Sequence, residues 1–334
     1  MKRITKITAM GLLLLAGMGT AKAQDPHYTQ YYVYPSWLNP ALTGVFDGSA
    51  RVSAIYRNQW GNIASPYQTP GVSADFNTNK NAAFGLSVLN QRAGDGGFNY
   101  TTAYASMAYS GIRFGADGYK RLNLGFQLGM IQRRFDISKM SFGEQWNPST
   151  GYNPGAGSGE SLSKTSATSF DAGVGAMYYD AQPGKKANLF AGISASHITR
   201  PTDQFSATGD AKIPVRYTGH AGLRIMLNEV ASITPNILYM RQGSAEEKMV
   251  GAYLQLNVAE DADFMLGANY RIKDAISPYL GVYVKDFLIG ASYDINTSDL
   301  GKMAKGSNSF ELSLTYIFKK AEKTPEVKFI CPRL

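Results

Sequence analysis

The sequence has very few of the residues from which catalytic and metal sites are built. Its 334 residues include one cysteine, Cys331, and three histidines, His27, His197 and His220. A single thiol excludes an internal disulfide and a metal site made of several thiolates. No phosphate-binding loop, H-E-x-x-H pair, EF-hand spacing or G-x-S-x-G elbow occurs. We therefore predict no catalytic residues, no cofactor and no metal site.

A long internal apolar run is also missing. A membrane-spanning helix needs about 20 consecutive apolar residues, and none occurs after residue 23. Aromatic residues nevertheless make up 12% of the chain, which also contains 35 glycines and 21 tyrosines. This composition favours strands over helices. If the chain crosses a membrane, it must do so as strands.

Residues 1–23 are typical of a secretory signal peptide, with a basic start at residues 2–6, an apolar stretch at 10–18 and an Ala-Lys-Ala cleavage motif at 21–23. The mature chain is then expected to begin at Gln24. Cleavage removes four basic residues and no acidic ones, so the formal charge falls from +8 to +4. That modest excess does not favour nucleic-acid binding.

Strict alternation of side chains appears near the end of the chain, in S-F-E-L-S-L-T-Y-I-F at 309–318. Phe310, Leu312 and Leu314 share one face of a strand, because successive side chains point to opposite faces. Similar blocks of about ten residues recur from Ser49 onward, as in transmembrane β-barrels. We predict an all-β fold, a single outer-membrane β-barrel of about fourteen antiparallel strands over residues 49–319, closed by 309–318.

The connections between the predicted strands alternate in length. One set is short throughout (77–81, 115–119, 180–186, 228–229, 260–263 and 285–286), and the other includes longer loops at 61–70, 136–166, 199–212 and 296–307. Three members of the second set, 93–97, 242–247 and 273–275, are also short. Outer-membrane barrels have short periplasmic turns, so we expect both termini in the periplasm.

Two segments flank the predicted barrel. Residues 24–48 are rich in aromatic residues and proline without a sustained period. We expect them in the periplasm, packed against or plugged into the periplasmic mouth, although a flexible lead-in is an alternative. Residues 320–334 form a predicted periplasmic tail. Candidate partner-binding residues in these segments are Tyr31, Trp37, Cys331 and Arg333.

The loop 136–166 adds two further candidates for partner binding, Trp146 and Tyr152. A loop of this length is usually functional or disordered, and both interpretations remain open. Side-chain parity also places charged residues in the lumen: Arg216, His220, Arg224, Arg271, Asp171, Asp294 and Glu311. They form either an ion-pair network that stiffens the wall or a basic lining for an anionic solute.

Four short motifs carry a resemblance to a known family. They are Q-D-P-H-Y-T-Q-Y at 24–31, N-P-A-L-T-G at 39–44, Y-R-N-Q-W at 56–60 and C-P-R-L at 331–334. Together they closely resemble the PorP/SprF family, which are outer-membrane barrel proteins of the type IX secretion system of Bacteroidetes. The last motif has Leu334 where the family more often has an aromatic residue.

The resemblance implies a non-enzymatic component that supports export or surface attachment of secreted cargo, such as the adhesins of gliding motility. The partners it implies are the periplasmic PorK/PorN ring, a PorE-like cell-wall linker and a cognate secreted adhesin. The surrounding lipid would be that of the outer membrane. The alternative is a passive outer-membrane porin or solute uptake channel.

Overall fold

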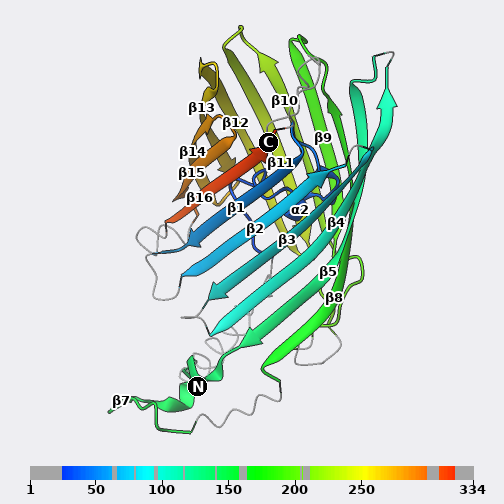
Figure 1. Ribbon diagram of the computed structural model, residues 1–334. Coiled ribbons are helices and arrows are strands. Elements are labelled where there is room, and N and C mark those ends of the chain that lie inside the picture. Colours follow the sequence, from blue (N-terminus) through cyan, green and yellow to red (C-terminus); the bar gives the residue numbers. More distant parts are fainter. Residues whose placement is uncertain are drawn as a thin grey trace, which may run out of the picture.

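The computed structural model describes residues 25–61, 66–78, 80–93, 97–115, 117–139, 141–157, 164–203, 205, 211–298 and 308–319. Fourteen of its strands form one closed antiparallel barrel (Figure 1). They are β1 (Ala50–Gln59), β2 (Tyr67–Asn77), β3 (Ala82–Ala93), β4 (Phe98–Phe114), β5 (Lys120–Phe135), β8 (Ser166–Asp180), β9 (Ala187–Ser196), β10 (Arg216–Met226), β11 (Ala231–Gln242), β12 (Ala245–Ala259), β13 (Ala262–Arg271), β14 (Ala275–Val284), β15 (Phe287–Asn296) and β16 (Ser309–Phe318). The predicted all-β barrel of about fourteen strands is confirmed.

Alternation of side chains explains why these segments close into a barrel. On β16, Leu312 and Leu314 are exposed on the outer wall, whereas Glu311 is buried inside. β16 then pairs with β1 from Ala50↔Phe318 to Asn58↔Phe310, which joins the two ends of the sheet. A one-residue slip would turn each apolar side chain into the lumen, so the pattern fixes the register.

The two ends of the barrel differ. We call the end where β1 begins and β16 ends the turn end, because all of its connections are short, at 78–81, 115–119, 181–186, 227–230, 260–261 and 285–286. The opposite, loop end carries 60–66, 94–97, 136–165, 197–215, 243–244, 272–274 and 297–308. Strand length also varies around the barrel: β4 has 17 residues and β5 has 16, whereas β13 and β16 have 10 each.

In the described residues, the helical segments are short and form no part of the barrel wall. α2 (Pro35–Leu38) and the 3₁₀ turn η1 (Pro40–Leu42) lie inside the barrel, where the main cluster of buried apolar side chains is found. The loop after β5 holds η2 (Ile137–Lys139), η3 (Gly143–Gln145) and a hairpin of β6 (Trp146–Asn147) and β7 (Gly151–Tyr152). Within the part of the chain described above, no helix is long and apolar enough to cross a membrane.

Candidate functional site

Residues 25–48, here called the N-terminal segment, run through the lumen from the loop end to the turn end (Figure 1). At the loop end, the backbone N–H of Asp25 donates to Oε1 of Gln242, the last residue of β11, at 2.8 Å. At the turn end, Nδ2 of Asn77 donates to the carbonyl oxygen of Gly48 at 3.0 Å. The segment therefore spans the length of the barrel.

This path changes two expectations about the segment. It lies along the whole lumen and is not confined to one mouth of the barrel. The expectation that both termini lie in the periplasm does not fit it either, because Asp25 and Phe318 are at opposite ends of the barrel. The physical reason is that a buried aromatic segment makes more contacts inside the lumen than at its rim.

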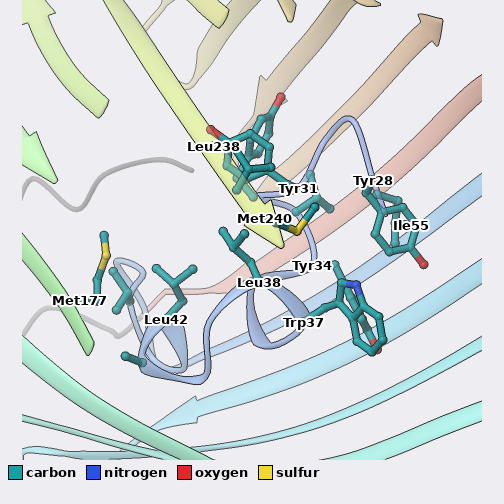
Figure 2. Close-up of a cluster of buried hydrophobic side chains, with 14 of the residues drawn as sticks. Tyr28, Tyr31, Tyr34, Trp37, Leu38, Leu42, Ile55, Met177, Leu238 and Met240 are labelled. Carbon is teal, nitrogen blue, oxygen red and sulfur yellow. The ribbon is translucent and has the colours of Figure 1, made fainter. Parts of the chain in front are cut away.

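Aromatic and aliphatic side chains of the segment fill the space between opposite walls (Figure 2). Tyr31 lies beside Leu238 and Met240 of β11, whereas Leu42 lies towards Met177 of β8. The segment's side chains are largely removed from solvent, with Tyr34 and Leu42 each 1% exposed. Such burial strongly favours the inserted position, since each large apolar side chain contributes about 1.5–3 kcal/mol.

A buried group of charges lines the wall near the loop end; Arg57, Arg271, Asp294 and Glu311 are called the charged cluster here. Arg57 pairs with Asp294 at 2.8 Å and with Glu311 at 2.5 Å. Arg271 reaches the same Asp294 at 2.7 Å. Buried charges are costly unless paired and hydrogen-bonded, and here two cations face two anions across β1, β13, β15 and β16.

The N-terminal segment completes the charged cluster. The backbone N–H of Thr29 donates to Oε1 of Glu311 at 2.6 Å, and that of Gln30 donates to Oε2 at 2.8 Å. The Thr29 hydroxyl donates to Oδ1 of Asp294 at 2.9 Å. Both carboxylates therefore depend on the segment for part of their hydrogen bonding, as buried carboxylates require.

A second ionic group, the rim cluster, consists of Asp25, Asp171, His197 and Arg216. His197 lies between the two carboxylates, with Nε2 at 2.6 Å from Asp25 and Nδ1 at 2.8 Å from Asp171. Arg216 donates to Asp25 at 3.1 Å. Burial lowers the pKa of His197, but the nearby carboxylates outweigh burial and raise the pKa to about 9. His197 is thus cationic at neutral pH and ties the start of the segment to β8.

The opposite wall meets the segment at glycines. Gly125, Gly175 and Gly192 on β5, β8 and β9, the glycine wall, face residues 39–41. An added Cβ at Gly125 would collide with the backbone of Pro40 and Ala41. Absence of a side chain therefore allows the segment's backbone to lie directly against the sheet.

Asn39 fixes the segment on the glycine wall. Its Oδ1 accepts from the backbone N–H of Ala41 at 2.9 Å and so caps η1. Its Nδ2 donates to the carbonyl oxygens of Ala176 at 3.0 Å and Ile193 at 3.2 Å. His220 lies beside it, with Nε2 at 3.3 Å from Nδ2 of Asn39.

Near the turn end, Asp75 anchors the last part of the segment. Its Oδ2 accepts from the backbone N–H of Gly44 and from Arg51, both at 2.8 Å. Thr43 meets Ser106 of β4, with the two hydroxyl oxygens 2.9 Å apart. Polar contacts thus accompany the segment through the entire lumen.

The seven residues predicted to line the lumen fall into separate places. Six are buried on the inner wall: Arg216, His220, Arg271, Asp171, Asp294 and Glu311. Arg271, Asp294 and Glu311 meet in the charged cluster, and Asp171 and Arg216 in the rim cluster. Arg224 is half-buried nearer the turn end and donates to Ser232 at 3.5 Å.

The predicted partner-binding residues are not brought together. Tyr31 and Trp37 are buried in the lumen, where Arg216 stacks on the Trp37 ring at 4.1 Å from its centroid. Trp146 and Tyr152 pair across the β6–β7 hairpin at the loop end, with ring centroids 6.0 Å apart, and are 62% and 43% exposed. Cys331 and Arg333 lie outside the described residues.

Sequence reasoning missed most of the anchors that the segment itself provides. Asp25, Thr29, Gln30 and Asn39 belong to the motifs that carried the family resemblance, yet those motifs were treated only as identifiers. His197 was noted only as one of three histidines. The available signal was a run of small polar residues among aromatics, which indicates buried hydrogen bonding.

Comparison with known proteins connects this geometry to a family and a fold. A family model described as "Type IX secretion system membrane protein PorP/SprF" matches residues 20–316. Among solved structures, the Ralstonia pickettii toluene transporter TbuX is 12% identical, with 84% of this chain and 92% of that chain covered at a TM-score of 0.51. The CymD monoaromatic hydrocarbon channel is 11% identical, with 92% and 97% covered at 0.48. A search of curated proteins found no match.

Proposed function

Since the chain belongs to the PorP/SprF family of type IX secretion system membrane proteins, we propose that it is a non-enzymatic outer-membrane component that supports export or surface attachment of secreted cargo. Gliding adhesins are one such cargo class. It acts through contacts with cargo and with periplasmic machinery. Cargo need not pass through its own lumen.

The observation that carries this proposal is the occupied lumen. The N-terminal segment crosses the barrel from Asp25 to Gly48 and bonds to walls on opposite sides. The buried side chains of the segment occupy space between opposite walls, so a polypeptide in transit would compete with the segment for the lumen. An occupied barrel is better suited to present surfaces than to conduct cargo.

We propose that the turn end faces the periplasm, since outer-membrane barrels have short periplasmic turns. In this topology, residues 1–23 are a signal peptide that directs export, and residues 320–334 form a periplasmic tail. Partners on that side are the PorK/PorN ring and a PorE-like cell-wall linker. Asp25 then lies near the outer surface, where the exposed Trp146 and Tyr152 form a candidate contact for a cognate adhesin.

Deletion of the gene, followed by proteomics of the cell surface and medium, tests the proposal. Loss of one adhesin would indicate a dedicated partner, and loss of all type IX cargo would indicate a core component. Complementation with the W146A/Y152A double variant then tests the hairpin separately. Unchanged export in the deletion strain contradicts the proposed function.

A passive channel is the second candidate, because the barrel overlaps that of a toluene transporter at a TM-score of 0.51. At 12% identity this likeness concerns the fold alone. Planar bilayers containing the purified protein distinguish the candidates: we expect no stable open steps with the segment inserted. Anion-selective conductance would instead favour a basic lumen lining.

A further inference from the structure

The outer wall formed by β3, β4, β5 and β8 changes abruptly from apolar to polar. Cross-strand pairing places one apolar row at Val88, Ala103, Met130 and Phe170. The next row towards the loop end holds Asn90, Thr101, Gln132 and Thr168. Neighbouring outward residues on a strand are about 7 Å apart, so the apolar surface ends within a single step.

The polar row is organised by hydrogen bonds between its members. Nδ2 of Asn90 donates to the Thr101 hydroxyl at 2.7 Å, and Nε2 of Gln132 donates to the Thr168 hydroxyl at 3.4 Å. The outer wall of a membrane barrel carries an apolar band of limited height. We therefore infer that the polar row lies at the edge of this band on the long-stranded wall.

A basic row follows immediately, with Arg92, Asn99, Arg134 and Ser166 in register. Lys139 projects beside it from the loop after β5. A surface cavity of about 380 Å³, here called the basic pocket, lies among these side chains; its lining includes Asn90, Arg92, Thr101, Gln132, Arg134 and Lys139. Asp136 is the one acidic residue in the described lining.

The cations of the basic pocket keep donors available. Arg92 uses Nε to donate to Asn90 at 3.0 Å. No ion pair of 4 Å or less between described residues includes Arg92, Arg134 or Lys139, although the Asp136 carboxylate attracts Lys139 and Arg134 over a longer distance. Asp136 is already held by Ser138, whose hydroxyl donates to Oδ1 at 2.6 Å. Two neighbouring guanidinium groups, each with several N–H donors, suit the tetrahedral oxygens of a phosphate.

The walls made of β11, β13 and β15 look different at the same end. Their outward residues near the loop end include Tyr239, Tyr270 and Tyr293, with Arg241 beyond Tyr239 and Ile295 beyond Tyr293. The nearby Lys248 is paired with Glu246 at 3.0 Å. The basic pocket is thus a local feature of the long-stranded wall and is not part of an even ring of cations.

We propose that the basic pocket binds the phosphate of a phosphorylated glycolipid head group in the outer leaflet. The acyl chains lie against the apolar rows of β3, β4, β5 and β8, and the sugar phosphate reaches Arg92 and Arg134. The proposal rests on the loop end facing outward, but it is independent of which cargo the protein serves.

Titration of the purified full-length chain in detergent, read by native mass spectrometry, tests this site. The probes are bisphosphorylated lipid A, fully dephosphorylated lipid A, phosphatidylglycerol and inorganic phosphate. The variant is R92Q/R134Q, and the matched control is R241Q, an exposed arginine at the loop end of β11. All three positions are exposed, so folding is preserved and can be verified by heat-modifiable gel mobility.

We expect bisphosphorylated lipid A to bind most tightly, and its affinity to fall about fivefold for each arginine removed. R241Q should bind like the wild type, and dephosphorylated lipid A should bind weakly to every form. Equal affinity of R92Q/R134Q and the wild type overturns the proposal. So does phosphatidylglycerol or inorganic phosphate binding as tightly as bisphosphorylated lipid A.

Discussion

Two opposite walls of the barrel hold the same segment by different means. β1, β13, β15 and β16 hold it through the charged cluster, in which backbone N–H groups of Thr29 and Gln30 serve the Glu311 carboxylate. β5, β8 and β9 hold it through the glycine wall, against which Asn39 and its neighbours pack. The first wall binds the segment mainly through paired charges, and the second binds it mainly through close packing against glycines. Each therefore has its own sensitivity to substitution.

The charged cluster should show the largest effect. R57M keeps much of the side-chain volume but leaves Asp294 and Glu311 with one fewer cation in a buried site. Removal of one partner from a buried ionic group costs about 3–5 kcal/mol. Urea unfolding in lipid vesicles, followed by tryptophan fluorescence, measures the loss.

R241A is the matched control for R57M, because Arg241 is an exposed arginine on β11. It should change the free energy of unfolding by less than about 0.5 kcal/mol. If R57M proves as mild as R241A, the charged cluster does not hold the segment.

The rim cluster adds a pH-dependent contribution at the loop end. The pKa of His197 is about 9 in the folded protein against an ordinary value of 6.5. Because the pKa is raised on folding, His197 contributes its full stabilisation of the folded state below pH 6.5. This contribution is lost as the pH rises through 9. We expect about 2 kcal/mol to be lost between pH 7 and pH 10.

Acid also weakens the rim cluster, but through Asp25. Burial raises the pKa of Asp25, but His197 and Arg216 outweigh it and hold that pKa well below its usual value. Its stabilising contribution is present above the ordinary value of 3.8 and is lost as the pH falls further.

Urea titrations at a series of pH values compare the wild type with H197Q, which should lack the alkaline loss. If H197Q loses as much free energy of unfolding in alkali as the wild type, another group causes the loss.

The glycine wall should respond to the addition of a single methyl group. G125A puts a Cβ onto the backbone of Pro40 and Ala41, and overpacking of this kind costs about 1–3 kcal/mol. At Gly219 on β10 an added Cβ meets nothing within 4 Å, so G219A is the control. If G125A and G219A have comparable free energies of unfolding, close packing of the segment against Gly125 does not contribute to stability.

The sequence predicted the wall of the barrel far better than its contents. Alternation is a local property, so Phe310 to Phe318 could be assigned to a closing strand without knowledge of its neighbours. The position of the N-terminal segment depends instead on partners such as Glu311, 282 residues away from Thr29. Composition indicated that residues 24–48 are buried, but no periodicity specifies which surface buries them.

The inward parity of charges was predictable, whereas their grouping was not. Asp171 and Asp294 both point inwards, yet they belong to different clusters because strand order and tilt bring different residues to the same level. Glycines illustrate the same limit. Gly125 and Gly129 both face inwards on β5, and only the structure shows that Gly125 lies against the segment's backbone whereas Gly129 lies against β4.

The smallest expected effect concerns Asn39, where the shape-based wall also uses hydrogen bonds. N39A removes the η1 cap and leaves the carbonyl groups of Ala176 and Ile193 without their amide donor. Loss of such a cap costs about 0.5–2 kcal/mol. N147A is a suitable control, since Asn147 accepts from the backbone N–H of Ser149 in an exposed hairpin. Urea unfolding measures the loss in free energy of unfolding for both variants. A loss in N39A alone means that the glycine wall holds the segment by hydrogen bonds as well as by close packing. Equal losses in N39A and N147A would mean that only close packing holds it.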